Sequence, residues 1–268
     1  CCCVSATQTG KEMQFFGARA NLAKCLLYAI NGGVDEKSGE QVGPNYAPIT
    51  AEYLDYDEVM AKYDKMMDWL VDIYVNTLNL IQYMHDKYYY EAAEMALIDT
   101  DVRRTFATGI AGFSHVVDSL SAIKYAKVKV VRDEDGLATD FEIEGDFPKY
   151  GNDDDYADDL MQDVFYLYHD LITGRPTMRG GKYGVDMLPT TCHVYFGDVI
   201  GATANGRKAH IPVSEGISPE KSADVNGPTA VIKSCAKMDH LATAGTLLNQ
   251  KFTPDVVAGE KGLDNMAS

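Results

Sequence analysis

The sequence predicts an α/β protein. Several long segments repeat apolar residues at helical spacing, and short runs of β-branched and aromatic residues lie between them. The chain has 268 residues, 46% of them hydrophobic, which is ample for a substantial core. This alternation indicates an α/β fold, with fewer clear strands than a closed sheet requires.

The first half of the chain is predicted to be helical. Its expected helices cover residues 15–30, 55–78, 89–97 and 101–125. The first ends at Asn31-Gly32-Gly33, a C-terminal signal, and the second opens at Asp55 with Glu58 three residues on. Gly109 and Gly112 indicate a break within the last helix.

Strands are expected from the middle of the chain onward. Residues 128–131 and 141–143 predict a hairpin, and the acidic residues 152–159 open a further helix, since negative charge is favourable at a helix N-terminus. Later elements are a strand at 192–196, a turn at Asn205-Gly206 and a helix at 228–241.

Composition excludes several classes of protein. A formal charge of −16 disfavours a nucleic-acid partner, which requires clustered Lys and Arg. No apolar run approaches the roughly 20 residues of a membrane helix, and no secretory signal opens the chain, so a cytoplasmic protein is expected. The six cysteines contain no C-x-x-C pair, which favours reduced thiols and no metal site.

Three adjacent cysteines open the chain. Neighbouring Cα atoms lie about 3.8 Å apart, so the sulfurs of Cys1, Cys2 and Cys3 must share one small site. Adjacent thiols allow one to carry a covalent acyl group while the other moves a hydrogen atom. Inert thiols or a regulatory disulfide between neighbours are the alternatives.

Phe16 and Arg19 accompany these cysteines. At a separation of three residues on the predicted helix they point the same way. The guanidinium of Arg19 suits a carboxylate, and Phe16 would exclude water beside it. The alternative is a structural salt bridge to one of the 40 acidic residues.

Long stretches of the chain resemble the active-site region of the pyruvate formate-lyase family of glycyl radical enzymes. The resemblance rests on Cys2-Cys3-Val4-Ser5, on residues 10–24 and 28–36, on Tyr83-Met84-His85-Asp86-Lys87-Tyr88, and on residues 118–125 and 132–136. It covers roughly the first 150 residues well.

This resemblance implies a fold and a domain organisation. Residues 1–268 would form part, the second half, of the ten-stranded α/β barrel of glycyl radical enzymes, starting at the active-site cysteine loop. The family's radical glycine lies in an Arg-Val-Ser/Ala-Gly-Tyr motif, which does not occur here. The chain is therefore expected to be an internal fragment with no C-terminal glycine radical domain, inactive alone.

The resemblance also implies the activity of a formate C-acetyltransferase, which converts pyruvate and coenzyme A to acetyl-CoA and formate in anaerobic glucose metabolism. Cys3 would pass a radical to Cys2, whose thiyl would attack the keto carbon and keep the acetyl group. Arg19 would hold the pyruvate carboxylate and Phe16 would pack against the substrate. A glycyl radical outside this chain, coenzyme A as co-substrate, a radical-SAM activating enzyme and a homodimer are implied, with no metal.

Two alternatives remain at this stage. From about Gly180 onward the sequence looks more like glycyl radical dehydratases and related lyases, which act on other small molecules. Those enzymes carry a glutamate two residues after the cysteine, whereas Ser5 follows Cys3 here, so acyl transfer is preferred. The second alternative is a non-catalytic or complementing fragment.

Overall fold

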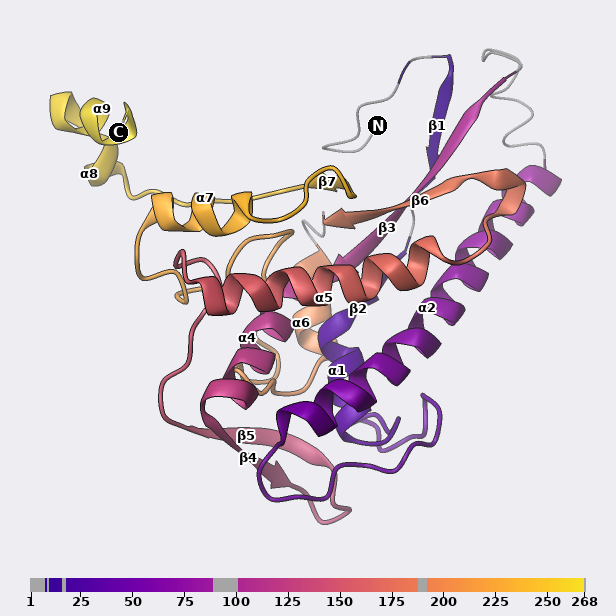
Figure 1. Ribbon diagram of the computed structural model, residues 1–268, viewed down its shortest axis with the longest axis horizontal. Helices are drawn as coiled ribbons and strands as arrows, with labels where there is room; N and C mark the ends of the chain where they lie inside the picture. Colours follow the sequence, from indigo (N-terminus) through magenta and orange to yellow (C-terminus); the bar gives the residue numbers. More distant parts are fainter. Residues whose placement is uncertain (1–7, 9, 16–17, 89–100, 188–191, 268) are drawn as a thin grey trace.

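The computed structural model describes residues 8, 10–15, 18–88, 101–187 and 192–267 (Figure 1). Its centre is a five-stranded parallel sheet. The strands are β1 (Glu12–Phe15), β2 (Arg19–Asn21), β3 (Arg103–Ala111), β6 (Lys182–Met187) and β7 (Thr243–Thr246). Both β1 and β2 pair with β3, and the order continues through β6 to β7. The predicted α/β class is confirmed.

Four helices form the layer that covers this sheet: α1 (Leu22–Ile30), α2 (Tyr56–Lys87), α4 (Phe113–Tyr125) and α5 (Asp155–Thr173). In Figure 1, α2 and α5 are the two long helices; α2 contacts β2, α5 contacts β6, and α1 contacts both α2 and α4. The shorter helices are η1 (Met178–Gly180), α6 (Cys192–Val199), α7 (Pro228–Ala236), α8 (Pro254–Val257) and α9 (Gly259–Ala267). Within the described ranges, no helix is both long and apolar enough to cross a membrane.

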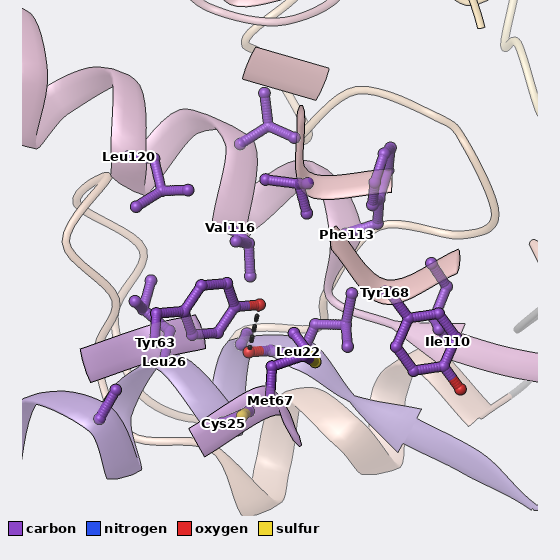
Figure 2. Close-up of a cluster of buried hydrophobic side chains, with 14 of the residues drawn as sticks. Leu22, Cys25, Leu26, Tyr63, Met67, Ile110, Phe113, Val116, Leu120 and Tyr168 are labelled. Carbon is purple, nitrogen blue, oxygen red and sulfur yellow. Dashed lines mark hydrogen bonds between the residues drawn. The ribbon is translucent and has the colours of Figure 1, made fainter. Parts of the chain in front are cut away.

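The core lies between the sheet and these helices. Figure 2 shows Leu22 of α1, Met67 of α2 and Ile110 of β3 among its side chains, all less than 2% exposed. The buried hydroxyl of Tyr63 donates a hydrogen bond to the carbonyl oxygen of Leu22 at 3.4 Å. Since each fully buried large apolar side chain contributes about 1.5–3 kcal/mol, this packing fixes the helices against the sheet.

The segment predicted as a helix over residues 15–30 is a strand followed by a helix. β2 ends at Asn21, whose side-chain oxygen accepts a hydrogen bond from the Lys24 backbone N–H at 3.1 Å and so caps α1. The helical expectation was therefore wrong for Arg19, which lies on the strand. The prediction was wrong because the apolar spacing of α1 continues by coincidence into the short strand β2.

The predicted helix over 101–125 is likewise a strand, β3, followed by α4. Gly112 forms the connection with φ of 74°, and a Cβ there would lie 2.8 Å from the Cβ of Ala23. Glycine alone meets both demands, the left-handed backbone and the close approach of α1. The expected break was correct, but it separates a strand from a helix.

Most of the other predicted helices and strands are present in the structure. The hairpin is confirmed as the antiparallel pair β4 (Lys127–Arg132) and β5 (Ala138–Glu144). The helices expected from 55, 152–159 and 228 correspond to α2, α5 and α7, and the turn at Asn205-Gly206 is present. The strand expected at 192–196 is wrong, because those residues form helix α6. The helix expected at 89–97 falls outside the described residues.

Candidate active site

Arg19 begins β2 and lies beside a gap in the side chains of β3. The register pairs Arg19 with Gly109, and Gly109 pairs with Asp186 of β6 on its other side. A Cβ on Gly109 would lie only 2.6 Å from Cγ of Arg19. Because Gly109 has no side chain, the Arg19 side chain can cross the middle strand toward Asp186.

These three residues share the face of the sheet that is turned away from the helices. Side chains alternate between the two faces along a strand. Ile110 and Val185, the sequence neighbours of Gly109 and Asp186, belong to the core beneath the helices. Gly109 and Asp186 therefore face the opposite side, and Arg19 lies on that side by register.

The guanidinium of Arg19 lacks the structural salt bridge considered as its alternative role. No ion pair joins it to an acidic side chain in the described part of the chain, and its buried Nε has no hydrogen-bond partner. A buried guanidinium N–H without a partner costs free energy, which a bound carboxylate would recover. Arg19 therefore has the chemistry of an anion-binding residue.

The remaining residues expected in the site, Cys2, Cys3 and Phe16, lie outside the described residues. The structure therefore places Arg19 alone among them. The expectation that Phe16 and Arg19 share a helix face does not hold, since Arg19 is on a strand.

Asp186 is a candidate site residue that sequence reasoning missed. It is 5% exposed, and its Oδ1 is buried without a hydrogen-bond partner. Burial raises the pKa of this carboxyl to about 6, and the positive charge of Arg19 opposes part of that rise. An acidic residue between Val185 and Met187, two apolar residues of a buried strand, is the sequence signal that could have revealed it.

A second set of buried polar residues lies around His115 of α4. The His115 Nε2 accepts a hydrogen bond from the Ser214 backbone N–H at 3.0 Å, and its Nδ1 lies 3.5 Å from Oε1 of Glu220. Burial, with a further contribution from the charge of Arg207, lowers the pKa of His115 to about 3. The ring is therefore neutral at pH 7, and its contacts fasten the loop containing Ser214 and Glu220 to α4.

A separate cavity of about 580 Å³ opens between the loops that follow α6 and β7. Its lining includes His193, Glu215, Glu220, Asn249 and Lys251, but neither Arg19 nor Asp186. The cavity is thus distinct from the Arg19 face of the sheet. In the described part of the chain, no group of three His, Cys, Asp or Glu side chains is arranged to bind a metal ion.

Comparison with protein families agrees with this architecture. The pyruvate formate lyase-like family model matches residues 1–197, which is most of the chain. The chain belongs to this family. A glycyl radical enzyme from Archaeoglobus fulgidus has the same fold, with a TM-score of 0.78 at 23% identity, covering 99% of this chain and 37% of that one, so the sheet and its helices are a fragment of an α/β barrel.

Three relatives show how far the similarity extends. The chain is 53% identical over 237 residues to the PFL-like enzyme TdcE of Escherichia coli K12, covering 88% of this chain and 31% of that protein. Hydroxyproline dehydratase from Clostridioides difficile superposes with a TM-score of 0.82 at 39% identity, covering 99% of this chain and 37% of that one. The B12-independent glycerol dehydratase from Clostridium butyricum gives 0.78 at 28% identity, again covering 99% and 37%.

A second family model, glycine radical, matches residues 213–268. From the sequence, these residues are expected to belong to one barrel fragment without such a domain, and the Arg-Val-Ser/Ala-Gly-Tyr motif does not occur among them. The match supports a glycyl radical as the cofactor of the enzyme. The chain spans about a third of the length of the relatives it matches, so the activity of a whole protein is a matter of proposal.

Proposed function

We propose that this chain supplies the thiol pair and the carboxylate site of a formate C-acetyltransferase, which converts pyruvate and coenzyme A to acetyl-CoA and formate. The observation that carries the proposal is the unpartnered, buried Nε of Arg19, on the sheet face opposite the helices. A bidentate guanidinium is well matched to the carboxylate of a 2-oxo acid. The 53% identity to a PFL-like enzyme supports the same reaction class.

Each proposed residue has one role. Arg19 holds the substrate carboxylate, and Phe16 packs against the substrate and excludes water. Cys2 reacts as a thiyl radical: its sulfur forms a bond to the keto carbon, the bond to the carboxylate carbon breaks, and the acetyl group remains on Cys2 as a thioester. The carboxylate leaves as a radical anion and takes a hydrogen atom from the Cys3 thiol, which gives formate and leaves the unpaired electron on the Cys3 sulfur. The coenzyme A thiol then accepts the acetyl group and returns Cys2 to a thiol.

The glycyl radical supplies hydrogen-atom abstraction from a cysteine thiol. Of the proposed residues, the structure describes only Arg19, whose guanidinium suits the carboxylate of a small substrate. We further propose that residues 1–268 act as part of a larger barrel in a cytoplasmic, homodimeric enzyme of anaerobic metabolism, activated by a radical-SAM enzyme.

A second candidate is a dehydratase or another lyase of the same family. It is favoured by the superposition on hydroxyproline dehydratase across 99% of this chain. The proposed acyl transfer needs no acid two residues beyond the cysteine, and Ser5 stands at that position after Cys3. The sequence therefore favours acyl transfer over dehydration.

A substrate panel separates the two candidates. The natural polypeptide that contains this chain is activated anaerobically and supplied with pyruvate plus coenzyme A, 2-oxobutyrate plus coenzyme A, trans-4-hydroxy-L-proline, or glycerol. We expect formate and an acyl-CoA from the 2-oxo acids, and no dehydration of the two alcohols. Dehydration of either alcohol without formate from a 2-oxo acid would establish the second candidate instead.

A further inference from the structure

Asp186 and Arg19 lie on either side of Gly109, which has no side chain to separate them. Both pair with Gly109, from β6 and β2 respectively, and both lie on the face away from the helices. A ligand carboxylate bound by Arg19 on this face therefore lies beside the carboxyl group of Asp186. The two side chains must be considered as one site.

The carboxyl of Asp186 has a hydrogen-bonding position that the described residues do not fill. Its Oδ1 is buried and unpartnered. The nearby hydroxyl of Tyr74, from α2, donates to the carbonyl oxygen of Ala18 at 2.6 Å. Tyr183, from β6, shares its face with Val185 and packs against the core on the other side of the sheet. The hydroxyl proton of Tyr74 is therefore not available to Asp186, and a ligand is the natural partner.

The charges at the site determine whether Asp186 is protonated or ionised when an anionic ligand is bound. Among the described residues, the charged groups facing the site are Arg19 and Asp186, while burial raises the pKa of the nearby Tyr74 and keeps its hydroxyl neutral. With Asp186 ionised, its charge cancels that of Arg19 and repels a carboxylate. With Asp186 protonated, the site is cationic and the acid gains an O–H donor.

We propose that Asp186 is a second substrate-binding residue, which in its protonated form donates a hydrogen bond to the substrate carboxylate held by Arg19. Binding of a 2-oxo acid then takes up one proton at Asp186. The inference rests on the proposed function for the identity of the substrate. It adds a residue and a pH dependence that the reaction itself does not require.

The sign of the pH dependence follows from the carboxyl group. Its pKa lies at about 6 before binding, so protonated Asp186 is abundant below this pH and scarce above it. The dissociation constant for pyruvate is then flat below pH 6 and rises about tenfold per pH unit well above it. The Asp186→Asn variant keeps a hydrogen-bond donor and cannot ionise. It is expected to vary less than about threefold from pH 6 to 8, and to bind pyruvate about tenfold or more tightly than wild type at pH 8.

Binding is measured by calorimetry on the full-length, unactivated enzyme, with pyruvate, 2-oxobutyrate and acetate as probes. Titrations in two buffers of different ionisation enthalpy report the protons taken up, without any variant. The matched control is Asp118→Asn, since Asp118 is also a fully buried acid but lies on α4, where its Oδ1 accepts a hydrogen bond from the Tyr150 backbone. The control should keep the pH dependence of wild type.

Each outcome decides a different claim. Proton uptake by wild type that disappears in Asp186→Asn supports the inference, even if the activated enzyme makes no formate, in which case the proposed function alone fails. Pyruvate binding without proton uptake, or an unchanged pH profile in Asp186→Asn, overturns the inference and leaves the proposed function standing. If wild type binds none of the three carboxylates at pH 6, both are overturned.

Discussion

At the scale of single residues, the site depends on a glycine, Gly109. Its backbone has ordinary strand conformation, which any residue could adopt, so conformation does not require glycine at this position. It is required by space, because Cγ of Arg19 occupies the volume that a Cβ would need. The position of Arg19 is therefore fixed by the smallest residue of β3.

This dependence predicts the effect of Gly109→Ala. The added methyl group displaces Arg19 from its contact, and a shift of about 1 Å at a substrate-positioning group can reduce kcat/KM about 100-fold. Overpacking also lowers the free energy of unfolding by about 1–3 kcal/mol. Steady-state kinetics with pyruvate and denaturant unfolding measure the two effects on the full-length enzyme.

The control for this variant is Thr105→Ala, on the same strand and the same face, four residues from Gly109. Among the described residues, the side chain of Thr105 makes one long hydrogen bond, at 3.4 Å, to the Met13 carbonyl oxygen. Its kcat/KM should stay within about threefold of wild type. An equal loss in both variants would show that Gly109 acts through general sheet stability and not through Arg19.

At the scale of elements, a buried ion pair fastens α1 to the loop after α6. Glu36 accepts hydrogen bonds from Lys24 Nζ of α1 at 2.8 Å and from the Gly201 backbone N–H at 2.6 Å. The side chain of Glu36 is 2% exposed and that of Lys24 is 12% exposed. Since α1 follows directly from β2, this pair also fixes the strand that carries Arg19.

Removal of one partner of this pair should therefore be costly. We expect Glu36→Ala to lower the free energy of unfolding by about 3 kcal/mol, since it leaves a buried ammonium with Asp35 as its remaining ion-pair partner. The comparison is Lys208→Ala, which breaks an exposed pair with Asp140 and should cost less than about 1 kcal/mol. Equal losses for the two variants, measured by urea unfolding, would show that burial of the pair has no energetic role.

Element types were predictable where one periodicity extends over many residues. The long helices α2 and α5 and the β4–β5 hairpin follow from apolar spacing and turn residues in the sequence. The strands β2 and β3 do not: β2 has only three residues, too few to show a period, and β3 is continuously buried from Phe106 to Ala111, so that it lacks polar alternation. Helix α6 was mistaken for a strand because Val194, Tyr195 and Phe196 favour strands locally.

The site was predictable only in part, because one of its residues is joined to the other only by the register of the sheet. Arg19 was selected from its residue type and its neighbours, and the structure supports an anion-binding role for it. Asp186 lies 167 residues further along the chain and meets Arg19 only through the parallel register with β3. No local pattern contains that pairing.

At the scale of the whole molecule, the sheet is open at both edges in the described residues. β1 and β2 form one edge and β7 forms the other, and the chain covers 37% of the hydroxyproline dehydratase chain on which it superposes. We infer that the remaining strands of the barrel come from other parts of a larger protein. The face that carries Arg19 and Asp186 would then look into the barrel.

The most direct measurement is anaerobic formate production from pyruvate and coenzyme A by the activated full-length enzyme and by three cysteine variants. The account predicts formate from wild type and from Cys1→Ser, and a loss of at least about 1,000-fold in Cys2→Ser and in Cys3→Ser, since both thiols act in every turnover. Formate production that persists in either of the latter two variants would contradict the proposed radical acyl transfer at the cysteine pair.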